Sequence, residues 1–114
     1  MKLLGREDIL AADDTRTVDV EVPEWGGVVR LRVMTGAARQ AFLRAASKRA
    51  GDDDGLVEAL IVACAVDEHG QRIFSPDDVP ALREKSGAAL QRVFAAAAEL
   101  NGLTDDAVDR LAGE

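Results

Sequence analysis

The most informative segment of the chain reads Val18-Asp19-Val20-Glu21-Val22-Pro23-Glu24-Trp25-Gly26-Gly27-Val28-Val29-Arg30-Leu31-Arg32-Val33. Apolar and polar residues alternate on both sides of Gly26-Gly27, which is typical of two β-strands joined by a tight turn. With the glycines as the two central residues of a primed turn, Val22 lies opposite Leu31, and Glu21 lies opposite Arg32. The pattern therefore predicts a β-hairpin with this turn and this register.

In this register one face of the hairpin is apolar and the other is charged. The apolar face comprises Val18, Val20, Val22, Val29, Leu31 and Val33, and the charged face comprises Asp19, Glu21, Arg30 and Arg32. Because an isolated hairpin is marginally stable, its valine face must be covered by helices from the rest of the chain. Pro23 has no amide hydrogen to donate, so we expect it at a free edge or at an irregularity of the strand.

After the hairpin the spacing of apolar residues changes to that of amphipathic helices. A threonine that can act as an N-cap opens a predicted helix over residues 35 to about 49. The strongly apolar segment 56 to about 66 predicts a central buried helix, because its alanines favour helix over the alternative of a buried strand. A capping serine opens a further helix over residues 86–100, and an Asn-Gly pair ends it.

Shorter elements are predicted between and around these helices. Residues 67–70 form a turn, after which Ile73 and Phe74 anchor the returning segment to the core. Segment 75–82 has the signals of a short helix with Ser75 as its cap. Because Pro80 would lose a hydrogen bond inside this helix, the alternative is a helix that begins at Asp78.

Together the elements predict an α+β fold, in which an N-terminal β-hairpin packs on a small bundle of about four to five helices. A last helix is expected to begin at Thr104, and a turn of helix is expected through residues 9–10. A length of 114 residues suits a single domain over residues 1–114. Its N-terminal segment and hairpin occupy residues 1–34, and its helical part occupies residues 35–114.

Composition narrows the class of partner. The 47% of hydrophobic residues is rich in alanine, and the aromatics are three Phe, one Trp and no Tyr, so we expect a thin core that gains from homo-oligomer formation. The formal net charge of −7 repels nucleic-acid phosphates and anionic lipid. No signal peptide is readable, and no segment is long enough to span a bilayer. We therefore expect a polypeptide partner, with no nucleic acid and no membrane.

The residues able to carry chemistry all have a structural explanation. Cys64 lies in an apolar run, which predicts a buried thiol, and a lone cysteine fits a reducing cytoplasm. His69 lies in a predicted surface turn without a second histidine or cysteine nearby. Most of the aspartate clusters stand where helices begin, as at Asp52–Asp54, Asp77-Asp78 and Asp105-Asp106, and are interpreted as caps. We predict no catalytic residue, no metal site and no cofactor, and hence no enzyme.

The hairpin and the helix predicted after it contain the residues that we expect to bind a partner. Six cations gather there, namely Arg30, Arg32, Arg39, Arg44, Lys48 and Arg49. A nucleic-acid patch is one interpretation, but no aromatic residues interleave these charges, which favours a solvated face or a docking surface for an acidic protein. Trp25, beside the turn, either packs locally or anchors an interface. The predicted partner-binding residues are Trp25, Arg30, Arg32 and Phe42.

Several blocks of sequence follow one another in an order typical of one protein family. The blocks are Met1-Lys2-Leu3-Leu4; Ile9-Leu10-Ala11-Ala12-Asp13-Asp14; Val20-Glu21-Val22-Pro23-Glu24-Trp25-Gly26-Gly27 with Arg30 and Arg32; Val66-Asp67-Glu68 with Gly70, Ile73 and Phe74; and Glu84-Lys85-Ser86 with Leu90, Val93, Phe94 and Gly102-Leu103-Thr104-Asp105. In these blocks the chain resembles the phage tail assembly chaperones of long-tailed phages and prophages, over nearly its full length. No single block is a chemical signature, so their order carries the resemblance.

The resemblance implies a non-enzymatic protein of the bacterial host cytoplasm that binds the tape measure protein during tail assembly. It would keep this client soluble and help tail tube protein polymerise around it, and a longer frameshifted product often accompanies such chaperones. Trp25, the hairpin edge and apolar helix grooves are the surfaces we expect to engage amphipathic segments of the client. Two alternatives are a small phage DNA-binding regulator, which would use the basic first helix, and a structural head-tail or tail-completion protein.

Overall fold

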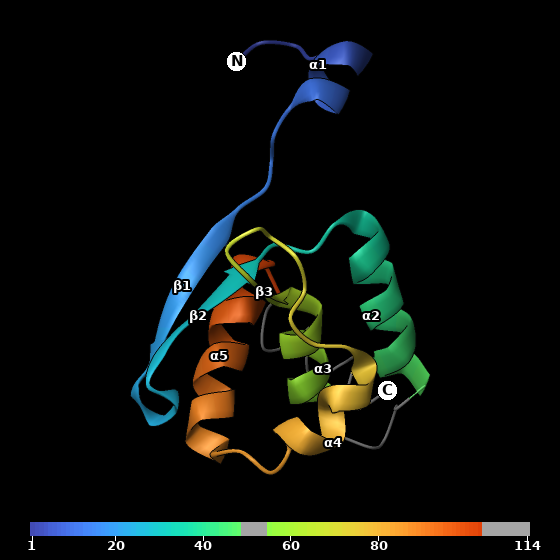
Figure 1. The fold of residues 1–114 in the computed structure, drawn as a ribbon. Coiled ribbons are helices and arrows are strands. Elements are labelled where there is room, and N and C mark those ends of the chain that lie inside the picture. Colours follow the sequence, from blue (N-terminus) through green and yellow to red (C-terminus); the bar gives the residue numbers. More distant parts are fainter. Residues whose placement is uncertain (49–54, 104–114) are drawn as a thin grey trace.

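A computed structural model describes residues 1–48 and 55–103 of the chain. In chain order its elements are α1 (Arg6–Ala11), β1 (Thr17–Val22), the 3₁₀ turn η1 (Pro23–Trp25), β2 (Gly27–Arg32), α2 (Gly36–Lys48), α3 (Leu56–Cys64), β3 (Ala65–Val66), the 3₁₀ turn η2 (Pro76–Asp78), α4 (Val79–Leu82) and α5 (Gly87–Leu100). The hairpin of β1 and β2 crosses α5, and α3 lies between α5 and α2 (Figure 1). The predicted α+β class is confirmed.

The hairpin forms, but its turn and register differ from the prediction. Val22 pairs with Gly27 and not with Leu31, a displacement of four positions (31 − 27). Pro23 begins a 3₁₀ turn that closes when the Gly26 amide donates to the Pro23 carbonyl at 3.0 Å. Gly26 has φ +78° and Gly27 does not have a positive φ, whereas a type I′ turn needs positive φ at both of its central residues. The fixed φ of Pro23 thus favours a four-residue loop, and the predicted two-glycine turn is wrong.

The displacement leaves the two faces of the hairpin as predicted, because a shift by an even number of residues returns every side chain to the same side. It changes the cross-strand charge pair. Arg30 lies opposite Asp19 and donates to its carboxylate at 2.8 and 3.1 Å, whereas the prediction placed Glu21 opposite Arg32. The Arg30 guanidinium accordingly lowers the pKa of the Asp19 carboxyl.

A third strand extends the sheet beyond the hairpin. β3 pairs antiparallel with β2, so that Val66 lies opposite Arg30, and the strand order is β1-β2-β3. The prediction ran the helix on to residue 66 and is wrong for these last two residues. The turn predicted after them is confirmed, since the Gly70 amide donates to the Asp67 carbonyl at 3.0 Å. β1 consequently forms an edge of the sheet.

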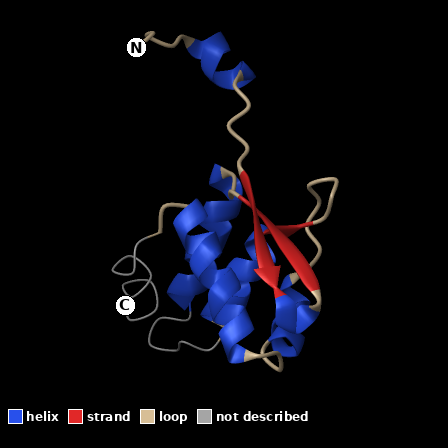
Figure 2. Ribbon diagram, turned by 90° about the vertical axis from the view of Figure 1, so that its left-hand side faces the viewer, coloured by secondary structure: helices blue, strands red, loops and turns tan. Residues whose placement is uncertain are grey.

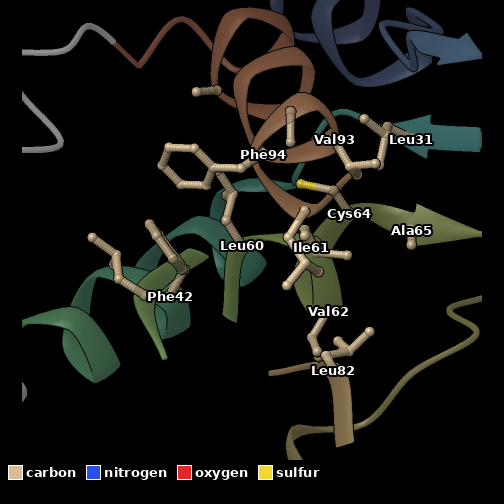
Figure 3. Packing of buried hydrophobic residues seen from close by; sticks show 14 of the residues in the cluster. Leu31, Phe42, Leu60, Ile61, Val62, Cys64, Ala65, Leu82, Val93 and Phe94 are labelled. Carbon is tan, nitrogen blue, oxygen red and sulfur yellow. The ribbon is translucent and has the colours of Figure 1, made fainter. Parts of the chain in front are cut away.

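The core lies where the inner face of the sheet meets α3 and α5 (Figure 3). α3 buries six of its nine residues, which confirms the predicted central buried helix. Val22 and Leu31 from the hairpin are fully buried, and α5 packs against both hairpin strands. The expectation that helices cover the valine face is therefore confirmed.

Most of the predicted helix starts are confirmed by their caps. The hydroxyl of Thr35 accepts from the Ala38 amide at 3.1 Å, and that of Ser86 accepts from the Ala89 amide at 3.3 Å. Segment 75–82 divides into η2 and α4, so that both predicted starting points are used in turn. The helix predicted from Thr104 and the aspartate clusters at 52–54 and 105–106 lie outside the described residues, as does the end of the helix predicted to reach residue 49.

Two segments place apolar side chains in solvent. Ile73 is 48% exposed, so its predicted role in the core is wrong: its amide is anchored to the Ala65 carbonyl at 3.2 Å, and Phe74 supplies the buried contact. The predicted N-terminal turn of helix is confirmed as α1. It stands apart from the rest of the chain beyond the end of β1 (Figures 1 and 2), and none of its six residues is buried. Residues 1–14 are called the N-terminal arm below.

In the described part of the chain, every helix is too short or too polar to cross a lipid bilayer.

Candidate functional site

The four predicted partner-binding residues do not form one site. Trp25 is 36% exposed at the tip of the hairpin, whereas Phe42 lies on the buried side of α2 and is 6% exposed. Arg30 is held by Asp19 on the outer face of the sheet. Arg32 is half-buried and donates to the Gly70 carbonyl at 3.2 Å. Trp25 is thus the predicted residue that best combines exposure with a large apolar surface.

Trp25 lines an open groove between the hairpin turn and α4. The groove has a volume of about 470 Å³ and is lined by Glu24, Trp25, Phe74, Asp78, Ala81, Leu82 and Lys85. We call it the Trp25 groove. Its lining combines apolar side chains with the charged groups of Glu24, Asp78 and Lys85. A hollow of this kind fits an apolar side chain of another polypeptide that carries polar neighbours.

The hairpin side of the Trp25 groove is held to the body of the protein by an ion pair. Arg92 of α5 donates two hydrogen bonds to the Glu24 carboxylate, at 2.8 and 3.0 Å. These bonds lower the pKa of the Glu24 carboxyl to about 2, with a smaller contribution from the backbone amide of Glu24 itself. Because Glu24 directly precedes Trp25, the pair links the turn that presents the indole to α5.

The opposite wall is built by Phe74, by the end of η2 and by α4 together with Lys85 that follows it. The Ser75 amide donates to the Asp78 carboxylate at 2.8 Å, which fixes the acid at the groove. Leu82 is 6% exposed and Phe74 is half-buried against the core, so both give this wall a firm apolar base. The sequence did not predict this wall. Its first residue, Phe74, follows Trp25 by 49 positions (74 − 25), and no local pattern links the two segments.

A second hollow, the α2–α3 groove, lies on another part of the surface. It has a volume of about 140 Å³ and is lined by Ala38, Ala41, Phe42, Ala45, Ala59, Val62, Ala63, Arg72, Pro76 and Val79. Phe42 and Val62 are buried, and the many alanines leave room above them. The residues lining the two grooves are different. Phe42 therefore contributes to the α2–α3 groove and not to the surface around Trp25.

Three of the six cations that the sequence gathers in the hairpin and the following helix contact other parts of the fold. Arg30 pairs with Asp19, and Arg32 holds the 67–70 turn through the Gly70 carbonyl. Arg39 donates to the Asn101 carbonyl at the end of α5, at 3.0 Å. These contacts explain the three charges as parts of the fold, without a nucleic-acid partner.

The residues considered for chemistry lie in unreactive settings. Cys64 is fully buried, and burial raises the pKa of its thiol to about 11, although a hydrogen bond from Asn101 partly offsets this. The thiolate needed for nucleophilic attack is therefore scarce at neutral pH. The His69 side chain is exposed beside Glu68, as predicted. Within residues 1–48 and 55–103, no group of three or more His, Cys, Asp or Glu side chains is placed to hold a metal ion.

The described part of the chain combines a small α+β body, a tryptophan at the hairpin turn and two surface grooves. Comparison with known proteins gives the family: the model of the phage tail assembly chaperone family matches residues 6–110, and the chain belongs to that family. A solved structure described as the bacteriophage HK97 tail assembly chaperone is 26% identical in sequence, with a TM-score of 0.57, and the match covers 87% of this chain and 95% of that one. The curated proteins contain no significant match. The resemblance stated above is confirmed.

Proposed function

We propose that this tail assembly chaperone binds the tape measure protein of its phage, keeps it soluble, and promotes assembly of the tail tube around it. The Trp25 groove is the observation that carries the proposal. Binding, and not catalysis, is the proposed activity, in the cytoplasm of the bacterial host. Tail tube protein would join the complex once the client is held.

The Trp25 groove suits an amphipathic client segment because its anchor is already in place. Tryptophan is among the residues that contribute most to binding when a partner covers them. The Glu24–Arg92 pair holds the turn before any partner arrives, so less conformational entropy is lost when the client binds. Asp78 and Lys85 can then orient a client segment through charges at the edge of the contact.

The acidic composition supports the second half of the proposal. A formal net charge of −7 on 114 residues keeps a protein and its complexes in solution. A client that exposes apolar segments aggregates through those segments, and a bound acidic chaperone both covers them and adds like charge.

The test is co-expression with the tape measure protein encoded by the same phage. The wild-type chaperone should keep the client in the soluble fraction, and Trp25→Ala should weaken binding by about 2 kcal/mol, or roughly thirtyfold, and return the client to the pellet. Val28→Ala is the matched control, because Val28 is also exposed on the hairpin, outside the residues that line the Trp25 groove. A client that stays equally soluble with Trp25→Ala would refute the assigned groove, and one insoluble with wild type would refute the proposed function.

Purified virions separate the proposal from a structural role in the tail. A chaperone that leaves after assembly should be absent from the finished particle, whereas a tail-completion protein should be found there by mass spectrometry. Detection in virions at a stoichiometry similar to that of other tail proteins would contradict the proposal.

A further inference from the structure

One edge of the sheet is formed by β1, which pairs with β2 on one side and with no other strand of the described chain (Figure 1). Just beyond the two strands, the Val33 amide donates to the carbonyl of Arg16, which lies opposite it, at 2.9 Å. Hydrogen-bonded positions alternate along an antiparallel pair, so the even-numbered residues of β1 turn their backbone groups toward β2. The odd-numbered residues turn theirs outward, namely Thr17, Asp19 and Glu21.

The outward backbone groups of β1 are unpaired and uncovered. No hydrogen bond reaches them within residues 1–48 and 55–103, and the residues that carry them are exposed. Proteins commonly protect such an edge with proline, lysine, a bulge or a covering segment. β1 contains neither proline nor lysine, and its register with β2 runs without a bulge. A row of free amides and carbonyls of this kind is complementary to another extended chain, which can pair with it as a new strand.

The charges on β1 indicate which chain would pair with it. Asp19 and Glu21 give the outer face of β1 two acids and no cation. The Asp19 carboxylate is held by Arg30, whereas Glu21 lies opposite Val28 and has no cation across the pair. A second copy of β1 would place acid beside acid, which opposes pairing between copies. A lysine or arginine opposite Glu21 would be attracted, so the charges favour a basic strand.

The inner face of the same edge is apolar and only partly covered. Val18 is 37% exposed and Val20 is half-buried, although both lie on the side of the sheet that faces the core. The side chains of an added strand alternate between the two faces, so every second one would lie beside these valines. The complementary strand therefore alternates aliphatic with basic residues.

We propose that β1 binds an extended segment of a different protein, which alternates aliphatic with basic residues and adds to the three-stranded sheet as an antiparallel fourth strand. Its backbone pairs with Thr17, Asp19 and Glu21, its aliphatic side chains cover Val18, and its cations face Glu21. The contact does not rest on the proposed function, because no residue of β1 lines the Trp25 groove.

The test is amide hydrogen exchange of the full, isotopically labelled chain, followed by NMR. The probe is a peptide of about eight alternating lysine and valine residues with blocked ends. Without peptide, the amides of Asp19 and Glu21 should exchange fast and that of Val20 slowly. Saturating peptide should slow exchange at Asp19 and Glu21 by about tenfold or more. The same peptide N-methylated at its lysine amides keeps its charge but loses the donors that would face β1, so it should give no protection.

Two substitutions at Glu21 separate the backbone contact from the charge. Glu21→Pro removes one outward amide and leaves the bonds to β2 in place, so affinity for the lysine–valine peptide should fall by about tenfold or more. Glu21→Lys should weaken binding of that peptide and strengthen binding of a glutamate–valine peptide. Glu84→Lys is the matched control, because it makes the same change of charge at an exposed residue after α4, and it should bind like wild type at about 0.15 M salt. Circular dichroism checks the fold of each variant.

Several results would overturn the proposal. Fast exchange of the edge amides at saturating peptide, or equal binding of the N-methylated peptide, would mean that only charge attracts the probe. Slow exchange before any peptide is added would show that the edge is already covered, by another copy or by the chain itself. A Glu21→Lys variant that binds both peptides as Glu84→Lys does would contradict the charge complementarity. The Trp25 groove is tested separately, by the solubility of the client.

Discussion

Two sets of aliphatic side chains, one in the core and one on the N-terminal arm, are chemically alike and placed oppositely. Leu60 and Ile61 of α3 are 0% and 1% exposed, whereas Ile9 and Leu10 of the arm are more than half exposed. The core set fills space between the sheet and the helices, where each methyl group has partner atoms. The arm set lies largely in solvent. The difference teaches that residue type alone does not tell which apolar groups stabilise the fold and which remain available for binding.

The rate of thiol modification should show the largest difference between the core and the arm. Cys64 is fully buried and the pKa of its thiol is raised to about 11, so modification at pH 8 should require opening of the core. In a Cys64→Ala background, the exposed position altered by Leu10→Cys should react at once. We expect the two rates to differ by about a thousandfold or more, measured with a chromogenic disulfide reagent. Fast labelling of Cys64 in the folded protein would contradict the buried environment described here.

Truncation of one leucine in each region should separate the core from the arm in stability. Leu60→Ala removes a fully buried side chain and should lower the free energy of unfolding by about 2 to 5 kcal/mol. Leu10→Ala should change it by less than about 0.5 kcal/mol, because the side chain is mostly in water. Urea unfolding followed by circular dichroism measures both. Equal losses would mean that the arm packs on the body.

Asn101 tests whether the core also depends on a polar centre. Its side chain accepts from the Met34 amide at 2.8 Å and donates to the Ala97 carbonyl at 2.8 Å. Because Asn101 is 6% exposed, Asn101→Ala takes away the side-chain acceptor of the Met34 amide and one of two hydrogen bonds to the Ala97 carbonyl, which keeps the bond from the backbone amide of residue 101. The substitution should cost about 1 to 3 kcal/mol. Gln91→Ala on the exposed side of α5 is the control. An unchanged urea midpoint for Asn101→Ala would show that water replaces the lost bonds.

The Glu24–Arg92 pair should have the smallest effect and should appear mainly in its pH dependence. The pKa of the Glu24 carboxyl is lowered to about 2 in the folded protein, against about 4.3 in an unfolded chain. The pair therefore stabilises the folded protein fully at pH values above the pKa of Glu24 in the unfolded chain. This stabilisation is lost as the pH falls through the pKa of Glu24 in the folded protein. NMR titration of Glu24 should give a midpoint near 2. Arg92→Gln should raise this midpoint, and an unchanged midpoint in that variant would remove Arg92 as the cause.

Local patterns in the sequence predicted the parts of the fold that local interactions determine. Thr35 and Ser86 cap their helices as expected, and the composition of segment 56–66 predicted the central helix, which the structure ends at Cys64. The hairpin faces were also predictable, because they depend only on alternation. Its register was not, because the 3₁₀ turn begun by Pro23 competes with the two-glycine turn.

Contacts between distant segments account for what the sequence did not reveal. Ala65 and Val66 are strand residues only because β2 lies beside them, and nothing in their own neighbourhood breaks the helical pattern. Trp25 was identified as a candidate from its type and its place beside a turn. The groove around it depends on Phe74 and Leu82, which join it through the tertiary fold alone.

Fluorine NMR of the protein labelled with 5-fluorotryptophan tests the central claim most directly, because the sequence contains one tryptophan and the spectrum has one resonance to follow. On addition of the tape measure protein, the Trp25 resonance should shift and lose its sensitivity to solvent, in proportion to the client bound. A resonance that stays unchanged while the two proteins co-elute as a complex would show that the client is held elsewhere.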